Sequence, residues 1–439
     1  MIIRGGTVVT ARGVEKADIA IAGEQITAVG VNLPDDGEEI NASGLHVFPG
    51  GIDSHVHFNE PGRTEWEDIA HGSAALAAGG YTTFIDMPLN NLPVTTDVEA
   101  FDLKFDAMQR SSKVDFGLWG GLVPGNLAQL EPLVRRGVMG FKAFMCPSGI
   151  DEFPASDLIT LREGMKRIAA LDSILLVHAE DPQVLRSPSG KSWRDFVLSR
   201  PPEAEWSAIA HAVAIATETG CRLHVVHVST QHGFAMIREA QEHGVDVSGE
   251  TCPHYVLYAN YELERLGGIG KCAPPLRSTI FQGSLWDSLV GGQIPMVVSD
   301  HSPSTLELKR SDDFNAVWGG ISGCQSTRQL LLGQAQLDIG LVAAVTSTNI
   351  AQRLRLDGKD DIAPGSDADL WIVDLDHRDV VRSEDLFYRN QFSAHEGQPI
   401  RGRTVRTLVR GETVFSDGKP SDTPLGRLVT PSRGDAPQR

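Results

Sequence analysis

Residues 51–91 read GIDSHVHFNEPGRTEWEDIAHGSAALAAGGYTTFIDMPLNN, and this stretch decides how the rest of the chain is interpreted. Two histidines, His55 and His57, stand two residues apart at the end of an apolar run. In a β-strand, residues i and i+2 point to the same side, so both imidazoles can reach one metal ion or one metal of a pair. An H-x-H pair alone is a weak motif. Its meaning depends on whether further metal-type residues follow at the ends of later strands.

The middle of the chain alternates short strand-like runs with longer helical segments. Strands are predicted over residues 45–53, 81–87, 114–120, 140–145, 174–178, 223–228, 245–250 and 295–299. Helices are expected between them, for example over residues 66–78, 155–171, 203–219, 231–243 and 278–290. This alternation predicts an α/β protein with a (β/α)₈ TIM barrel. A doubly wound open sheet is the alternative, but no glycine-rich phosphate motif follows an early strand.

Both ends of the chain have a different texture, in which short apolar runs alternate with turn residues. Such segments are typical of paired β-strands, and hairpin turns are expected at Gly5-Gly6 and at Gly23-Glu24. Because the two ends resemble each other, we predict that they form one small β-sandwich domain together. The predicted organisation is a composite β domain (1–50 and 355–430), a barrel (51–354) and a loose tail (431–439).

Composition narrows the class of protein. The 439 residues are 41% hydrophobic and 22% charged, which is ordinary for a soluble globular protein. The formal net charge of −18 argues against a nucleic-acid partner. No apolar run approaches membrane-spanning length and no signal peptide is recognisable at the start, so no membrane association is expected. Five cysteines without a CxxC pair indicate reduced thiols and a cytoplasmic protein.

Metal-type residues recur at the ends of the predicted barrel strands, where the active site of such barrels lies. One such residue is unremarkable, but several polar groups converging on one rim are difficult to explain as structure alone. The set comprises His55 and His57 (first strand), Lys142 (fourth), His178 (fifth), His227 (sixth) and Asp300 (eighth).

Neighbouring histidines compete for some of these positions. His224 and His227 lie three residues apart, so in a regular strand they face opposite sides. The barrel-end position favours His227, and His224 is expected to pack outward under a helix. His301 is expected to point away from Asp300. For His254, orienting a substrate and capping a loop are both open. The cysteines are interpreted as packing residues.

Lys142 is the unusual member of the set because a charged ammonium cannot bind a metal. Its apolar neighbours disfavour the charged form, and a neutral lysine amine is nucleophilic. It could react with carbon dioxide to give a carbamate, whose two oxygens can bridge two metals. The alternative is a structural lysine paired with a carboxylate such as Asp300.

The ordered set H-x-H, K, H, H, D resembles the cyclic amidohydrolases of the urease-related superfamily. The resemblance runs nearly end to end and includes IAPGSDADLWIVDLD at residues 362–376. It implies two divalent metal ions, usually zinc, bridged by Lys142 as N6-carboxylysine; manganese and cobalt suit the same ligands. His55 and His57 would bind one metal, His178 and His227 the other, and Asp300 would contact the first metal and shuttle a proton. A homo-oligomer, dimer or tetramer, is implied as well.

Within that superfamily, several motifs in order are similar to those of the allantoinases. These are HVHFNEPGRTEWED (55–68), DMPLN (86–90), FKAFMCPSGIDEFP (141–154), ETCPHY (250–255), KCAPPLR (271–277), SDHSP (299–303) and WGGISG (318–323). Dihydroorotases have a carboxylate-binding arginine where this chain has Asn59, which suits a neutral ligand. Hydantoinases and dihydropyrimidinases have a carbonyl-polarising tyrosine where this chain has Pro147.

The resemblance implies hydrolysis of the hydantoin ring amide of (S)-allantoin to allantoate, with allantoin as the small-molecule partner. A metal-activated water would attack the ring carbonyl, and Asp300 would pass its proton to the departing nitrogen. Backbone groups of Ala273 and Gly319, with Asn59 nearby, would hold the ring. The alternative is a hydantoinase or dihydropyrimidinase. A non-catalytic binding protein of the dihydropyrimidinase-like kind is more remote, because this chain has every metal ligand.

Overall fold

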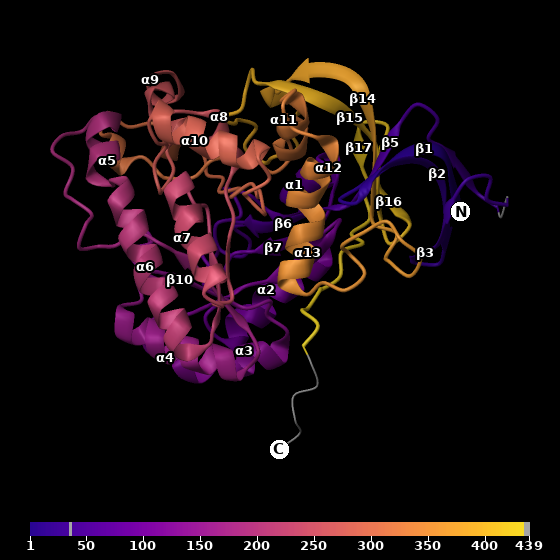
Figure 1. Ribbon diagram of the computed structural model, residues 1–439. Coiled ribbons are helices and arrows are strands. Elements are labelled where there is room, and N and C mark those ends of the chain that lie inside the picture. Colours follow the sequence, from indigo (N-terminus) through magenta and orange to yellow (C-terminus); the bar gives the residue numbers. More distant parts are fainter. Residues whose placement is uncertain (35–36, 434–439) are drawn as a thin grey trace.

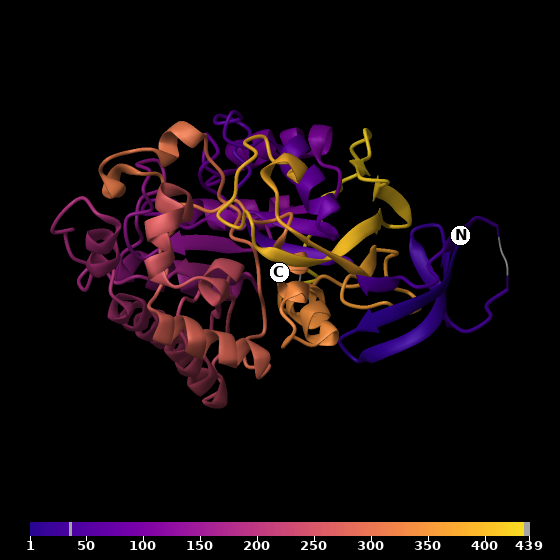
Figure 2. The same ribbon diagram turned by 90° about the horizontal axis from the view of Figure 1, so that it is seen from above.

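The chain folds into a parallel barrel and a β-sheet that is built from both ends of the sequence. The computed structural model describes residues 1–34 and 37–433. Figure 1 shows the terminal sheet on the right and the helix-covered barrel on the left, and the view from above in Figure 2 shows the same separation. The α/β class, with a barrel and a second domain made from both termini, is confirmed.

Seven of the eight barrel positions are formed by regular parallel strands, and the third of these positions consists of two short consecutive strands, β8 and β9. They occur in two ladders, β6-β7-β8 and β13-β12-β11-β10-β9, and the consecutive strands β8 and β9 join the two ladders. The bounds are β6 (Gly51–Val56), β7 (Tyr81–Asp86), β8 (Asp115–Leu118), β9 (Gly120–Gly121), β10 (Phe141–Phe144), β11 (Ile174–His178), β12 (Arg222–Val225) and β13 (Val247–Gly249).

The eighth position is occupied by an irregular segment. In place of a regular strand, the segment 295–301 makes single parallel bridges to its two neighbours: Val297 pairs with Thr251 beyond β13, and His301 pairs with Val56 of β6. These two bridges link the last barrel position to its neighbours on either side. The irregular backbone lies just where Asp300 enters the site.

The first predicted strand, 45–53, is wrong as one element. It is divided at Gly50 into β5 (His46–Pro49), which belongs to the terminal sheet, and β6, which begins the barrel. A Cβ atom on Gly50 would lie 2.1 Å from Thr82 Oγ1. A side chain is therefore excluded at the point where the chain passes from one sheet to the other.

The helices cover the outside of the barrel. All five helices predicted as examples are confirmed, but α1 and α4 begin later than expected because Asp68 and Asp157 cap them, accepting the N–H groups of His71 and Thr160. The bounds are α1 (Ile69–Ala78), α2 (Val98–Ser111), α3 (Leu130–Arg136), α4 (Leu158–Ala170), α5 (Trp193–Ser199), α6 (Pro202–Thr219), α7 (Gln231–Glu242), α8 (Pro253–Leu257), α9 (Leu263–Leu266), α10 (Thr279–Val290), α11 (Thr327–Gly333), α12 (Ile339–Ala343) and α13 (Asn349–Leu354).

The terminal sheet has the strand order β17-β16-β15-β14-β5-β1-β2-β3, with β4 paired to β1. The N-terminal and C-terminal halves meet where β5 pairs with β14, and the sheet has its own apolar core, which includes Ile3, Val47 and Ile372. The remaining bounds are β1 (Ile2–Thr10), β2 (Gly13–Ala22), β3 (Gln25–Gly30), β4 (Glu39–Asn41), β14 (Leu370–Val380), β15 (Pro399–Val409), β16 (Glu412–Ser416) and β17 (Lys419–Pro420).

One of the two predicted hairpin turns is wrong. The turn at Gly23-Glu24 joins β2 to β3 as expected, but Gly5-Gly6 lies inside β1, where the register with β2 shifts. Gly5 has φ +69° and donates its N–H to Asp18 Oδ1 at 2.8 Å. The glycine therefore forms a bulge in a continuous strand.

The end of the described chain contacts the barrel. Ser432 donates its N–H to the carbonyl of Arg355, and the Arg433 guanidinium donates to the carbonyls of Val134 and Val138. The rest of the predicted tail, 434–439, lies outside the described residues. The domain limits stay a prediction. In the part of the chain that the structure describes, no helix is long and apolar enough to cross a membrane.

Candidate metal centre

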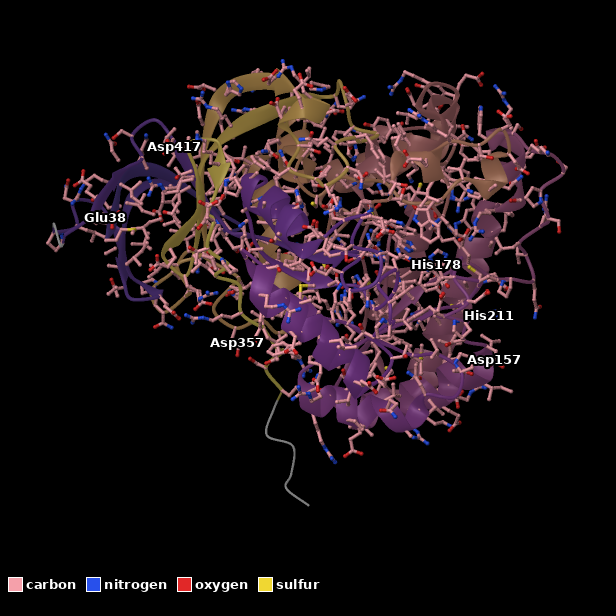
Figure 3. The ribbon with its side chains drawn as sticks, turned by 180° about the vertical axis from the view of Figure 1, so that it is seen from behind. Glu38, Asp157, His178, His211, Asp357 and Asp417 are labelled. Carbon is pink, nitrogen blue, oxygen red and sulfur yellow. The ribbon has the colours of Figure 1, made fainter. Side chains whose placement is uncertain are left out.

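The six predicted metal-type residues meet at the C-terminal ends of the barrel strands. His55 belongs to β6 and His57 follows it, Lys142 belongs to β10, His178 ends β11, His227 follows β12, and Asp300 follows the eighth position. All six are buried. Figure 3 shows His178 in the barrel half of the molecule, on the opposite side from Glu38 and Asp417 of the terminal sheet.

One group of donors consists of His55, His57 and Asp300. The Asp300 Oδ1 atom lies 3.2 Å from His55 Nε2 and 3.5 Å from His57 Nε2. Burial raises the pKa of Asp300, but His55, His57 and His227 outweigh it and hold the pKa far below its usual range. The three residues can together hold one cation.

A second group consists of His178 and His227, whose Nδ1 and Nε2 atoms lie 3.0 Å apart. The rings of His55 and His227 are 5.4 Å apart between centroids, so the two groups adjoin. Burial, followed by the neighbouring His178 and Lys142, lowers the pKa of His227 well below its ordinary value. Neutral imidazoles are the form of histidine that binds metals.

Lys142 acts on both groups, because its positive charge lowers the pKa values of His55, His178 and His227. Its side chain is fully buried, and its Nζ atom has no hydrogen-bond partner among the described residues. Burial lowers the pKa of Lys142 to about 7, although Asp300 and Glu250 oppose the shift. An orphaned amine that is easily neutralised fits a carbamate better than it fits a structural ion pair.

Two of the six residues have left-handed backbone conformations. The φ angles are +40° at His227 and +47° at Asp300, which are uncommon values for residues other than glycine. Such strain is found where surrounding contacts over-determine a functional site. At His227 it also breaks the alternation of the strand that precedes it.

The prediction for His224 is wrong: this histidine does not pack outward under a helix. His224 is in register with Leu176, which is in register with Lys142, so all three point to the same side of the barrel wall. His224 Nε2 lies 3.0 Å from Glu250 Oε2, inside the barrel. Both histidines face inward because β12 ends at Val225, before His227.

Glu250 supports the first group of donors, and the sequence prediction missed it. Its Oε1 atom lies 2.6 Å from His55 Nδ1, and Ser54 Oγ donates to its Oε2 at 3.2 Å. Burial raises the pKa of Glu250, but His224 and His55 bring it to about 2. An ionised Glu250 fixes the tautomer of His55 so that Nε2 faces the site. Its position at the end of the seventh predicted strand was the available signal.

Glu180 supports the second group in the same way. Its Oε2 atom lies 2.8 Å from His178 Nε2, which leaves His178 Nδ1 directed at His227. Arg200 donates from Nε to Glu180 Oε1 at 3.1 Å. Burial raises the pKa of Glu180, but Arg200 and His178 hold it below its usual range. The signal was its position two residues after His178, on the same side of an extended chain.

The donor set fits divalent cations. Histidine nitrogens, an ionised carboxylate and an orphaned amine suited to a carbamate converge in a buried space, and the carboxylates of Glu250 and Glu180 fix two of the histidines from behind.

The site opens into a cavity of about 390 Å³. The predicted substrate-binding residues Ala273 and Gly319 line it, and so does Pro147. Asn59 does not line it: it is fully buried, and neither side-chain polar atom has a hydrogen-bond partner among the described residues. The amide residues at the cavity wall are Asn90 and Asn315 instead.

The two remaining histidines differ. His301 points away from Asp300 as expected, with its Nε2 atom 3.4 Å from Glu67 Oε2. His254 is fully buried within reach of Cys252 and Asp300, and neither ring nitrogen has a hydrogen-bond partner in the described chain. All five cysteines are buried and free, in agreement with a packing role.

The chain is similar to known proteins along nearly its whole length. Residues 46–414 match the amidohydrolase family, and the chain belongs to that metal-dependent family. The allantoinases of Rubrobacter xylanophilus and Solibacter usitatus are 48% and 46% identical to it, over 99% and 98% of this chain and 98% and 96% of theirs. The allantoinase of Deinococcus radiodurans is 43% identical over 98% of both chains.

Solved structures of related enzymes have the same fold. The L-hydantoinase (dihydropyrimidinase) from Arthrobacter aurescens superposes with a TM-score of 0.94 at 32% identity, over 98% of this chain and 99% of that one. The dihydropyrimidinase from Brevibacillus agri gives a TM-score of 0.89 at 29% identity, over 99% of both chains.

Proposed function

We propose that this chain is an allantoinase, which hydrolyses the hydantoin ring amide of (S)-allantoin to allantoate in purine catabolism. The observation that carries the proposal is the 48% identity to an allantoinase over nearly the full length of both chains. The inward-facing histidines, Lys142 and Asp300 supply the donors that hydrolysis of a cyclic amide requires.

The proposed cofactor is a pair of divalent cations, most simply zinc, with manganese or cobalt as alternatives. His55, His57 and Asp300 would hold one cation and His178 and His227 the other, while Lys142, as N6-carboxylysine, would bridge them. Bound cations would polarise the ring carbonyl and lower the pKa of a water molecule.

Asp300 is the proposed proton shuttle because its Oδ1 atom lies at the centre of the first group of donors. Its carboxylate would accept the proton of the attacking water and deliver it to the ring nitrogen as the carbon–nitrogen bond breaks. Glu250 and Glu180 would keep the histidine tautomers fixed throughout.

The cavity wall favours allantoin over related rings. Pro147 lines the cavity and has no hydroxyl, so the wall lacks at that position the donor that hydantoinases are expected to use. Backbone groups of Ala273 and Gly319 line the cavity as well and are proposed to hold the ring. Asn59 stays a proposed substrate residue only if the wall rearranges on binding.

A hydantoinase or dihydropyrimidinase is the second candidate, favoured by the TM-score of 0.94 with the Arthrobacter enzyme. A steady-state assay of metal-supplemented protein on (S)-allantoin, dihydrouracil and dihydroorotate separates the candidates, with metal content measured on the same sample. We expect allantoate formation well above the other two products and about two metals per chain. Turnover of dihydrouracil but not allantoin would select the second candidate.

The location and the partners of the enzyme are also proposed. Reduced cysteines support a cytoplasmic location, and the net charge of −18 disfavours nucleic acid as a partner. A homo-oligomer, dimer or tetramer, is proposed by similarity, and size-exclusion chromatography with light scattering measures it directly.

A further inference from the structure

Two buried lysines outside the metal centre are inserted into one loop of the cavity wall, residues 314–320. Lys271 Nζ donates to the carbonyls of Phe314, Asn315 and Val317 at 2.8, 2.9 and 2.6 Å. Lys309 Nζ donates to the carbonyls of Trp318, at 3.0 Å, and Gly320. Five carbonyl groups of a seven-residue loop are therefore held by two ammonium groups.

Neither lysine has a carboxylate partner within salt-bridge distance among residues 1–34 and 37–433, although only 6% of Lys271 and 5% of Lys309 are exposed. Burial, together with Arg200, lowers the pKa of Lys271 to about 8, while Asp313 opposes the shift. Burial also lowers the pKa of Lys309 to about 7. Burying two cations without anions is costly, so the loop geometry they enforce requires an explanation.

The free backbone groups of the loop supply that explanation. Gly319 lies between the two carbonyls that Lys309 holds, and Gly320 donates its N–H to the carbonyl of Lys271 at 2.8 Å. For Gly319 itself, neither the N–H nor the carbonyl forms a backbone hydrogen bond within the described chain, and the residue lines the cavity. Both peptide units of Gly319 are thus anchored from one side, through the Trp318 carbonyl and the Gly320 N–H, which leaves the N–H and the carbonyl of Gly319 itself free at the cavity wall.

We propose that Lys309 and Lys271 are positioning residues, which hold the loop 314–320 so that the free backbone groups of Gly319 meet the cyclic amide. The proposal rests on the proposed function for the identity of the substrate. Lys271 lines the cavity and can touch a ligand itself, whereas Lys309 does not line it. Lys309 therefore provides the cleaner test.

The first experiment is hydrogen–deuterium exchange on metal-loaded Lys309→Met, which removes the ammonium and keeps most of the volume. We expect the amides of Trp318 and Gly320, which are hydrogen-bonded to Leu308 and Lys271, to exchange about tenfold faster or more than in the wild type. Lys359→Met is the matched control, because Lys359 is 8% exposed and is anchored to Asp115 and Asp369 away from the cavity. Unchanged exchange in Lys309→Met would overturn the proposal.

Kinetics separate positioning from general stability. In Lys309→Met we expect the KM for the ring substrate to rise about tenfold or more, with metal content unchanged and kcat much less affected. Lys359→Met should lower the Tm and leave KM unchanged. If Lys309→Met lowers Tm and kcat without moving KM, the lysine is only structural and the proposal fails.

Gly319→Ala covers the case in which Lys309→Met does not fold. An added Cβ would meet open space, so the variant should have the Tm of the wild type and a raised KM. An unchanged KM would show that no ligand approaches Gly319 and would overturn the proposal. Failure of the proposed function is distinguishable from failure of this proposal. If the wild type turns over another cyclic amide instead of allantoin, KM is measured on that substrate. If it turns over no cyclic amide, the exchange experiment still tests the loop, because it does not depend on turnover.

Discussion

Asp300 combines a strained backbone with contacts to two histidines, and this combination suits a group that must act from one fixed position. Its φ of +47° is maintained although left-handed conformations are costly for aspartate. His57 donates its N–H to the carbonyl of His301, the residue next to Asp300, which ties the first barrel strand to the eighth position. The carboxylate therefore has little freedom to move away from the reacting atoms.

Replacing Asp300 by asparagine should separate metal binding from proton transfer. The amide oxygen of Asp300→Asn can still contact a cation, but an amide cannot accept and return a proton, so kcat should fall by about 10²-fold or more. Metal content by elemental analysis and kcat on the same sample check this. A variant with full metal and a rate near that of the wild type would contradict the shuttle role.

Glu67 makes a pH-dependent contribution to stability. Burial raises its pKa to about 8, so the native state keeps a proton that the unfolded chain releases near the ordinary value of 4.5. The free energy of unfolding contributed by Glu67 therefore falls as pH rises from about 4.5 to about 8. Glu67→Gln preserves an acceptor for the N–H of Arg389 and removes the titration.

The measurement for Glu67 is urea unfolding at pH 5 and at pH 8. Glu67→Gln should be more stable than the wild type at pH 8, and this advantage should shrink at pH 5. Comparing the variant with the wild type cancels the other titrating groups. An equal difference at the two pH values would mean that Glu67 is ionised in the folded protein at both.

At the scale of elements, the junction between β5 and β6 depends on a glycine. Gly50→Ala would bring a Cβ to 2.1 Å from Thr82 Oγ1, and we expect a loss of about 1–3 kcal/mol from overpacking. Gly283→Ala in α10 is the control: its Cβ meets open space, and alanine should stabilise the helix by about 0.5–1 kcal/mol. Thermal unfolding of both variants checks the prediction, and equal Tm changes would contradict it.

Elements with strong local patterns could be predicted from the sequence, and those set by tertiary contacts could not. The helices follow apolar periodicity, so α6 and α7 lie close to their predicted limits, whereas α1 and α4 begin later, after their aspartate caps. The division at Gly50 depends on packing against Thr82, which has no local signal. His224 was misassigned because strand alternation was extended past Val225, where the strand ends. The roles of Lys271 and Lys309 depend on loop carbonyls brought together only by the fold.

At the scale of the whole molecule, a buried ionic cluster joins the terminal sheet to the barrel. Lys359 Nζ lies 2.9 Å from Asp115 Oδ2 of β8 and 2.7 Å from Asp369 Oδ2, next to β14. Arg410, which follows β15, also pairs with Asp115. Burial lowers the pKa of Lys359, but Asp369 and Asp115 outweigh it and hold the pKa above its usual range. The barrel and the sheet are therefore linked by buried charges, and removing one of them leaves its partner buried and unpaired.

Lys359→Met should weaken this junction without altering the metal centre. Removing the lysine leaves Asp115 and Asp369 short of a buried partner, and breaking such pairs costs about 3–5 kcal/mol. The Tm should fall, while metal content and KM stay those of the wild type, because the cluster lies outside the cavity wall. Adding Asp369→Asn to Lys359→Met should recover part of the lost stability, since Asp369 is the carboxylate left without a cation, whereas Asp115 keeps Arg410. A Tm equal to that of the wild type, or a loss of metal before any loss of stability, would mean that the cluster does not hold the two parts together.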